Sequence, residues 1–177
     1  ATKHPHLTAW RERMLARPGV QAALAMPDHT NPALRTFTGE ARITVESNEQ
    51  LPAVTMNALG LEVSRATIDN RSVAVATDEE AQTLTLTPRT PLRAGRHTIR
   101  ITYSGAIQDD AYGLFRVSYD ADGQTKRALA TQFEPGDARR FAPMWDQPNR
   151  RAVFSLTVTA PSDQLAVSNM PVAQQSR

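Results

Sequence analysis

The sequence predicts a mainly β protein: a twisted antiparallel β-sandwich or saddle with a short N-terminal helical segment. Apolar and polar residues alternate in several short runs after residue 36, and turn-forming residues separate these runs. Helical spacing, by contrast, is found near the start of the chain, over residues 7–26. Short strands with one apolar face pair into antiparallel sheets that bury those faces against each other, which is the basis of the prediction.

The first element is the helical segment. Leu7, Trp10 and Met14 fall at intervals of three and four, which places them on one helix face. "RPGVQAALAM" (17–26) is expected to restart a helix, because Pro18 is tolerated in a first turn, and "PDHTNP" (27–32) ends it. We therefore predict a helical head over residues 1–30 and a β-domain over residues 31–177.

The strands follow in order. Alternation predicts strands in "TFTGEARITVES" (36–47), "AQTLTLTP" (81–88), "HTIRITYSG" (97–105) and "FSLTVTAP" (154–161). Gly39, inside the first of these runs, is expected to mark a bulge or bend. "DADG" (120–123) predicts the tip of a hairpin that joins "GLFRVSY" (113–119) to "RALATQF" (127–133).

Composition excludes several classes of function. The chain of 177 residues is long enough to bury a core, and its lack of Cys excludes disulfides and thiolate chemistry. The basic excess lies in residues 1–26, which carry a net charge of +3, whereas the remainder carries −1, so the main body lacks the cationic groove of a nucleic-acid-binding domain. No apolar run is long enough to span a bilayer. "ATKHPHLTAW" has neither a start Met nor the apolar stretch of a signal peptide, so a processed or engineered boundary is expected there.

The segment "TQFEPGDARRFAPMWDQP" (131–148) carries the candidate site. Pro135 disfavours helical backbone at Glu134, so the Glu134 side chain leaves a stiff, extended stretch. Gln132 and Glu134 are two positions apart, which directs both to one side while Phe133 faces the other. This pattern predicts a small ligand-facing edge. Exposed polar faces are common, so a purely structural corner is the alternative.

Structural roles are expected for the other residues of this segment. Asp137 is placed to cap a short helix in "DARRFAP" (137–143). Arg139 and Arg140 are expected to hold the loop by pairing with Asp137 or Asp146, or with a neighbouring domain. Trp145 is expected to anchor the loop in the core.

The same segment, followed by "AVFSLTV" (152–158) and "AVSNMPV" (166–172), resembles the N-terminal β-domain of the zinc aminopeptidases related to aminopeptidase N. The resemblance runs from about residue 34 to 172, and "TFTGEARITV", Met56–Val63 and "YGLFRVSY" match in the same order. It implies a twisted β-saddle that packs on a thermolysin-like catalytic domain in cis. It also implies that Gln132 lines the pocket for the first side chain of a peptide substrate, and that Glu134 binds the substrate's free α-ammonium group.

The zinc-binding motif of that family is absent from the sequence. There is no H-E-x-x-H, no G-A-M-E-N stretch, and the histidines are scattered at positions 4, 6, 29 and 97. The resemblance therefore implies zinc for the full-length enzyme, but no catalytic residue, metal or cofactor in this chain, which is expected to be inactive alone. Departures from the family pattern are the missing opening strand, Met144 in place of Cys and Gln147 in place of Glu. The chain also ends where the family domain has further strands, so truncation is expected.

Alternatives remain open for the head and for the function. Residues 4–25, which include "AWRERMLARPGV", resemble the C-terminal helices of a glutathione S-transferase, and a helical hairpin packed on the next domain explains them equally well. The chain is either the substrate-anchoring domain of an aminopeptidase, a non-catalytic binding or scaffold module, or a chimeric fragment. Because bacterial relatives are often exported, the resemblance favours a periplasmic or extracellular location over a cytoplasmic one.

Overall fold

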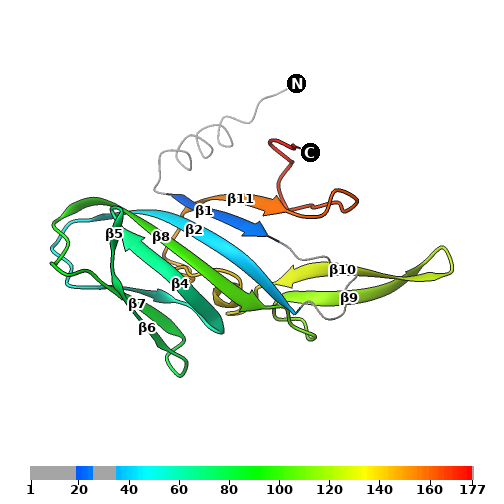
Figure 1. Cartoon of the computed structure of the whole chain (residues 1–177), viewed down its shortest axis with the longest axis horizontal. Helices are drawn as coiled ribbons and strands as arrows, with labels where there is room; N and C mark the ends of the chain where they lie inside the picture. The colour runs from blue at the N-terminus through cyan, green and yellow to red at the C-terminus, as the bar shows by residue number, and fades with distance from the viewer. Residues whose placement is uncertain (1–18, 26–34, 177) are drawn as a thin grey trace.

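The computed structural model describes the backbone of residues 19–25 and 35–176, and the side chains of residues 35–176. Within this part of the chain, strands dominate and the single helix is one turn of 3-10 helix (Figure 1). The elements are β1 (Gly19–Ala25), β2 (Thr36–Ser47), β3 (Val54–Asn57), β4 (Leu61–Ile68), β5 (Arg71–Ser72), β6 (Ala74–Asp78), β7 (Thr83–Thr87), β8 (Gly95–Ala106), β9 (Gly113–Ala121), β10 (Gln124–Gln132), η1 (Ala138–Arg140) and β11 (Val153–Thr159).

The largest sheet has six strands in the order β11-β1-β2-β8-β4-β5. Its centre is the long antiparallel pair β2–β8, which runs without interruption from Thr36 opposite Ala106 to Ser47 opposite Gly95. The pairs on either side are antiparallel as well, except for β1 and β11, which are parallel. A β-bulge interrupts the β4–β8 register between Val63 and Arg65.

Two smaller sheets accompany the large one. β3, β7 and β6 form a three-stranded antiparallel sheet, and β9 pairs with β10 in a hairpin that extends away at one end of the molecule (Figure 1). The hairpin tip confirms the sequence prediction, because Asp122 and Gly123 both have positive φ, as a tight hairpin turn requires.

The core lies between the six-stranded and the three-stranded sheets. Alternate residues of β2, β3, β7 and β8 are buried, as the period-two pattern predicts, whereas β5, β6 and β11 have no buried residue. The central members of the core are Phe37, Ala41 and Ile43 of β2, Ile99, Ile101 and Tyr103 of β8, Val54 and Met56 of β3, and Leu84 and Leu86 of β7. Two sheets, one antiparallel and one antiparallel except for its β1–β11 pair, pack on one core and confirm the predicted mainly β fold.

Two local predictions are wrong. Residues 19–25, expected to continue a helix, form β1, whose backbone pairs with β2 on one side and β11 on the other. A helix this short is marginal by itself, whereas two strand partners supply a full set of backbone hydrogen bonds. Gly39 marks no bulge, because its pairing with Tyr103 belongs to the uninterrupted β2–β8 register. The rest of the predicted head, residues 1–18 and 26–30, lies outside the described residues.

Candidate functional site

The candidate site is the turn that follows β10 at the base of the protruding hairpin (Figure 1). β10 ends at Gln132, and the Glu134–Pro135 peptide bond is cis. The Asp137 N–H then donates to the Phe133 carbonyl at 2.9 Å, which closes the turn before η1 begins. Glu134 therefore lies on a turn that the backbone hydrogen bond between Asp137 and Phe133 closes.

Gln132 and Glu134 are both exposed. Gln132 pairs with Gly113 in the β9–β10 ladder, so its backbone position is fixed. Among the described residues, neither side chain has a hydrogen bond or an ion pair with another residue. Phe133, between them, packs its ring against Phe141 at a centroid distance of 5.1 Å. The aromatic residue thus points to the protein while the amide and the carboxylate are open to solvent.

An ion pair holds the far side of the turn. The Arg139 guanidinium donates from Nε and Nη2 to the two carboxylate oxygens of Asp146, at 2.6 and 2.8 Å, and from Nη1 to the Gln82 side-chain oxygen at 2.8 Å. The side chains of Arg139 and Asp146 are only 20% and 10% exposed. A two-point pair of this kind fixes direction as well as distance. The predicted structural role of Arg139 is confirmed, with Asp146 as its partner.

Asp137 does not act as the predicted helix cap. It occupies the N-cap position of η1, but its carboxylate makes no capping hydrogen bond and instead accepts from Arg140 Nε at 2.9 Å. η1 is a single turn, so few backbone N–H groups need a cap, and the neighbouring guanidinium is the stronger donor. Gly113 allows η1 to lie close to β9, because a Cβ atom there would lie 2.9 Å from the Arg140 Cβ.

The end of the loop is attached to the core, as predicted. Trp145 Nε1–H donates to the Thr55 carbonyl at 2.8 Å, and Met144 exchanges two backbone hydrogen bonds with Asn57. Phe141 is buried against Phe37, and the Tyr103 hydroxyl donates to the Phe141 carbonyl at 3.1 Å, while burial raises the pKa of Tyr103. The arrangement is a rigid support that presents Gln132 and Glu134 to solvent.

Comparison with known proteins identifies the family. Residues 26–177 match the family described as the Peptidase M1 N-terminal domain, which is most of the chain. The chain belongs to this family. This chain is 44% identical over 142 residues to aminopeptidase N of Acetobacter pasteurianus, and the match covers 79% of this chain and 40% of that protein. It is 36% identical over 142 residues to aminopeptidase M1-D of Oryza sativa subsp. japonica, covering 78% of this chain and 16% of the relative.

The M1 N-terminal domain therefore spans less than half the length of these relatives. In the part of the chain that the structure describes, no three His, Cys, Asp or Glu side chains come together as a possible metal site. No helix among the described residues has the length and hydropathy that a membrane crossing needs. The described residues therefore do not fit a zinc site.

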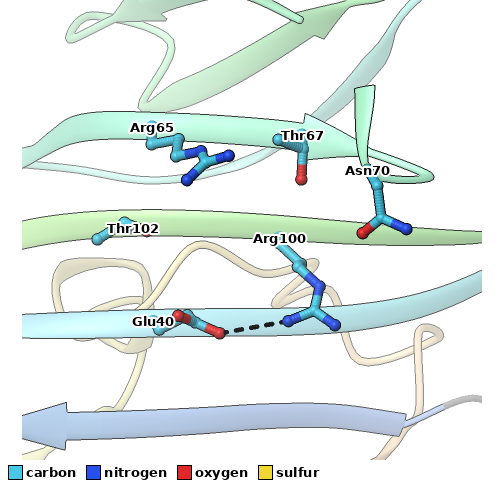
Figure 2. A pocket seen from close by; sticks show the side chains of 6 residues that line it. All are labelled: Glu40, Arg65, Thr67, Asn70, Arg100 and Thr102. Carbon is cyan, nitrogen blue, oxygen red and sulfur yellow. Dashed lines mark ion pairs between the residues drawn. The ribbon is translucent and has the colours of Figure 1, made fainter. Parts of the chain in front are cut away.

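Sequence reasoning missed a second polar site on the M1 N-terminal domain. A hollow of about 270 Å³ opens on the outer face of the six-stranded sheet (Figure 2). It is lined by Glu40 of β2, Arg65 and Thr67 of β4, Asn70 of the β4–β5 turn, and Arg100 and Thr102 of β8. In the sequence, the polar residues of each alternating run could be expected to face away from the core. Their convergence depends on strand order and register, which alternation does not give.

Proposed function

We propose that this domain anchors the N-terminal residue of peptide substrates in a zinc-dependent aminopeptidase that removes N-terminal residues. In this proposal Glu134 binds the free α-ammonium group, and Gln132 lines the pocket for the first side chain. Zinc and the hydrolytic step belong to a catalytic domain in cis. Membership of the M1 family supports the proposal, as do relatives that are named aminopeptidases.

One structural observation carries the binding role. Glu134 is exposed and has no partner among the described residues, although the turn that bears it is held by the Arg139–Asp146 pair and by the Phe133–Phe141 contact. A structural carboxylate in such a loop normally has a donor, as Asp137 and Asp146 both do. An unpaired carboxylate on a turn whose backbone is held in place suits an enzyme that measures from a positively charged chain end.

A surface that suits the cis partner also exists. Apolar side chains are exposed along β11 and the segment after it. In the part of the chain that the structure describes, most of the large exposed apolar residues lie here. They are Phe154, Leu156, Leu165, Val167, Met170 and Val172, with exposed fractions from 45% to 82%. Apolar surface of this kind is typical of contacts between domains.

The test is a chimera. The aligned part of the Acetobacter pasteurianus aminopeptidase N is replaced by this domain, and kinetics are measured with a substrate that has a free α-amine. Glu134→Gln keeps the shape of the side chain and removes its charge, so KM is expected to rise about ten- to hundred-fold, since a charge-assisted hydrogen bond contributes roughly 1.5–3 kcal/mol. Gln132→Ala is expected to change the preference among first residues.

Glu80→Gln is the matched control, because Glu80 is also exposed but lies in the β6–β7 turn. Glu80→Gln is expected to leave KM and substrate preference unchanged. If Glu134→Gln and Gln132→Ala also leave both unchanged in an active chimera, the anchoring role is wrong. The non-catalytic scaffold module is then the better account of the domain.

A further inference from the structure

We infer that the hollow on the outer face of the six-stranded sheet is a binding site for a doubly charged oxyanion of the phosphate type. The hollow is separate from the Glu134 turn: its lining comes from β2, β4, β8 and the β4–β5 turn (Figure 2). The inference is therefore independent of the proposed aminopeptidase role.

Strand register brings the cationic groups together. Arg65 and Glu40 both lie opposite Thr102, on the two sides of β8. Arg42 lies directly opposite Arg100 in the next row, on the same outer face of β2 as Glu40. Like charges placed opposite each other destabilise a sheet, so this arrangement is unfavourable unless an anion lies between them.

The carboxylate in the hollow does not neutralise this charge. Glu40 approaches Arg100 Nη1 only at 3.8 Å, and both side chains are about half exposed, so the ion pair is weak. Arg65 and Arg42 have no ion pair or hydrogen bond with the residues that the structure describes. Two guanidinium groups and one carboxylate in the lining leave a charge of +1, and Arg42 beside them raises it to +2. A dianion balances that charge, whereas a single carboxylate does not.

The donors of the hollow also lack an acceptor. Arg100 Nε is enclosed and has no hydrogen-bond partner among the described residues. Figure 2 shows the Thr67 hydroxyl and the Asn70 side chain directed toward the same space as the Arg65 guanidinium. An enclosed N–H without an acceptor costs stability, so the protein leaves part of this guanidinium unsatisfied. The side chain as a whole is 43% exposed, and an oxyanion in the hollow accepts from its terminal nitrogens and from the neighbouring donors at once.

The test is a titration of the 177-residue chain with inorganic phosphate at pH 7.5 and constant ionic strength, followed by the NMR signal of the Arg100 Nε–H group. We expect saturable binding that shifts this signal, and weaker binding of acetate, which carries one charge. Arg100→Gln and Arg65→Gln are expected to weaken phosphate binding about tenfold each, as measured by calorimetry. Arg89→Gln is the control, because Arg89 is exposed in the loop between β7 and β8, away from the hollow.

Glu40→Gln separates an anion site from a structural ion pair. Removing the carboxylate leaves both guanidinium groups in place, so phosphate binding is expected to tighten. This variant keeps the inference testable even if the arginine variants do not fold. The inference is overturned if phosphate does not saturate the signal, if Glu40→Gln leaves the affinity unchanged or weaker, or if Arg89→Gln weakens binding as much as Arg100→Gln. Equal affinity for acetate overturns the dianion assignment.

Discussion

At the scale of single residues, the nearly buried His97 side chain makes two hydrogen bonds that couple stability to pH. Its side chain is 11% exposed, with Nδ1 at 2.7 Å from an Asp69 carboxylate oxygen and Nε2 at 2.8 Å from the Arg93 carbonyl. Both neighbours are acceptors, so the protonated ring, which has an N–H on each nitrogen, suits this position best. The hydrogen bond to Asp69 raises the pKa of His97. Burial raises the pKa of Asp69, but the hydrogen bonds from His97 and from the Thr98 N–H outweigh it, so this pKa is lowered.

These shifts predict how stability depends on pH. The contribution of His97 is complete below its unfolded pKa of 6.5 and is lost as pH rises through the higher folded value. The contribution of Asp69 to stability is present above its unfolded pKa of 3.8, and it is lost as pH falls through the lower pKa of the folded state. Urea unfolding from pH 5 to 9 should show a loss of at most about 1 kcal/mol at the alkaline end, because Asp69 is half exposed.

His97→Gln is the control for this prediction, since the sequence contains three other histidines, at positions 4, 6 and 29. The variant should remove the alkaline loss that the His97–Asp69 pair causes. An identical pH profile in the wild type and in His97→Gln would show that the pair does not determine it.

At the scale of elements, the loop after β10 depends on the Arg139–Asp146 pair. Arg139→Ala leaves a nearly buried Asp146 carboxylate without its main donor, and we expect a loss of about 2–4 kcal/mol in the free energy of unfolding. Urea denaturation at pH 7 measures this loss. Arg35→Ala is the matched control, because the Arg35–Asp109 pair has a similar distance but side chains that are 57% and 71% exposed, so its loss should stay below about 1 kcal/mol. Equal losses in the two variants would contradict the structural role of Arg139.

Elements differ in how far the sequence predicts them. β2 and β8 show strict alternation, and the structure confirms both as strands. β1 was predicted as helix because Pro18 is tolerated in the first turn of a helix. One of its two strand partners, β11, lies near the other end of the chain, so the local pattern does not reveal it. Local propensity is a weak guide wherever distant segments complete the hydrogen bonding, and β1 is such a case.

At the scale of the whole molecule, stability rests on the contact between the six-stranded and the three-stranded sheets. Leu84 of β7 is fully buried in this contact. Leu84→Ala should therefore lower the free energy of unfolding by about 2–5 kcal/mol, measured by urea denaturation. Leu165→Ala makes the same chemical change at a side chain that is 82% exposed, and its effect should stay within about 0.5 kcal/mol. A small effect at Leu84 would mean that the two sheets do not share one core.

The sequence by itself determined the mainly β class, the hairpin tip at Asp122–Gly123, the Arg139–Asp146 pairing among its options and the family motif around Gln132 and Glu134. All of these depend on residues near each other in the chain, where alternation and turn chemistry act directly. Only the tertiary structure decided that residues 19–25 form a strand, that Glu134 has no partner among the described residues, and that Glu40, Arg65 and Arg100 line one hollow. Each of these depends on the order and register of strands distant in sequence, which the sum of many weak contacts fixes and no local pattern records.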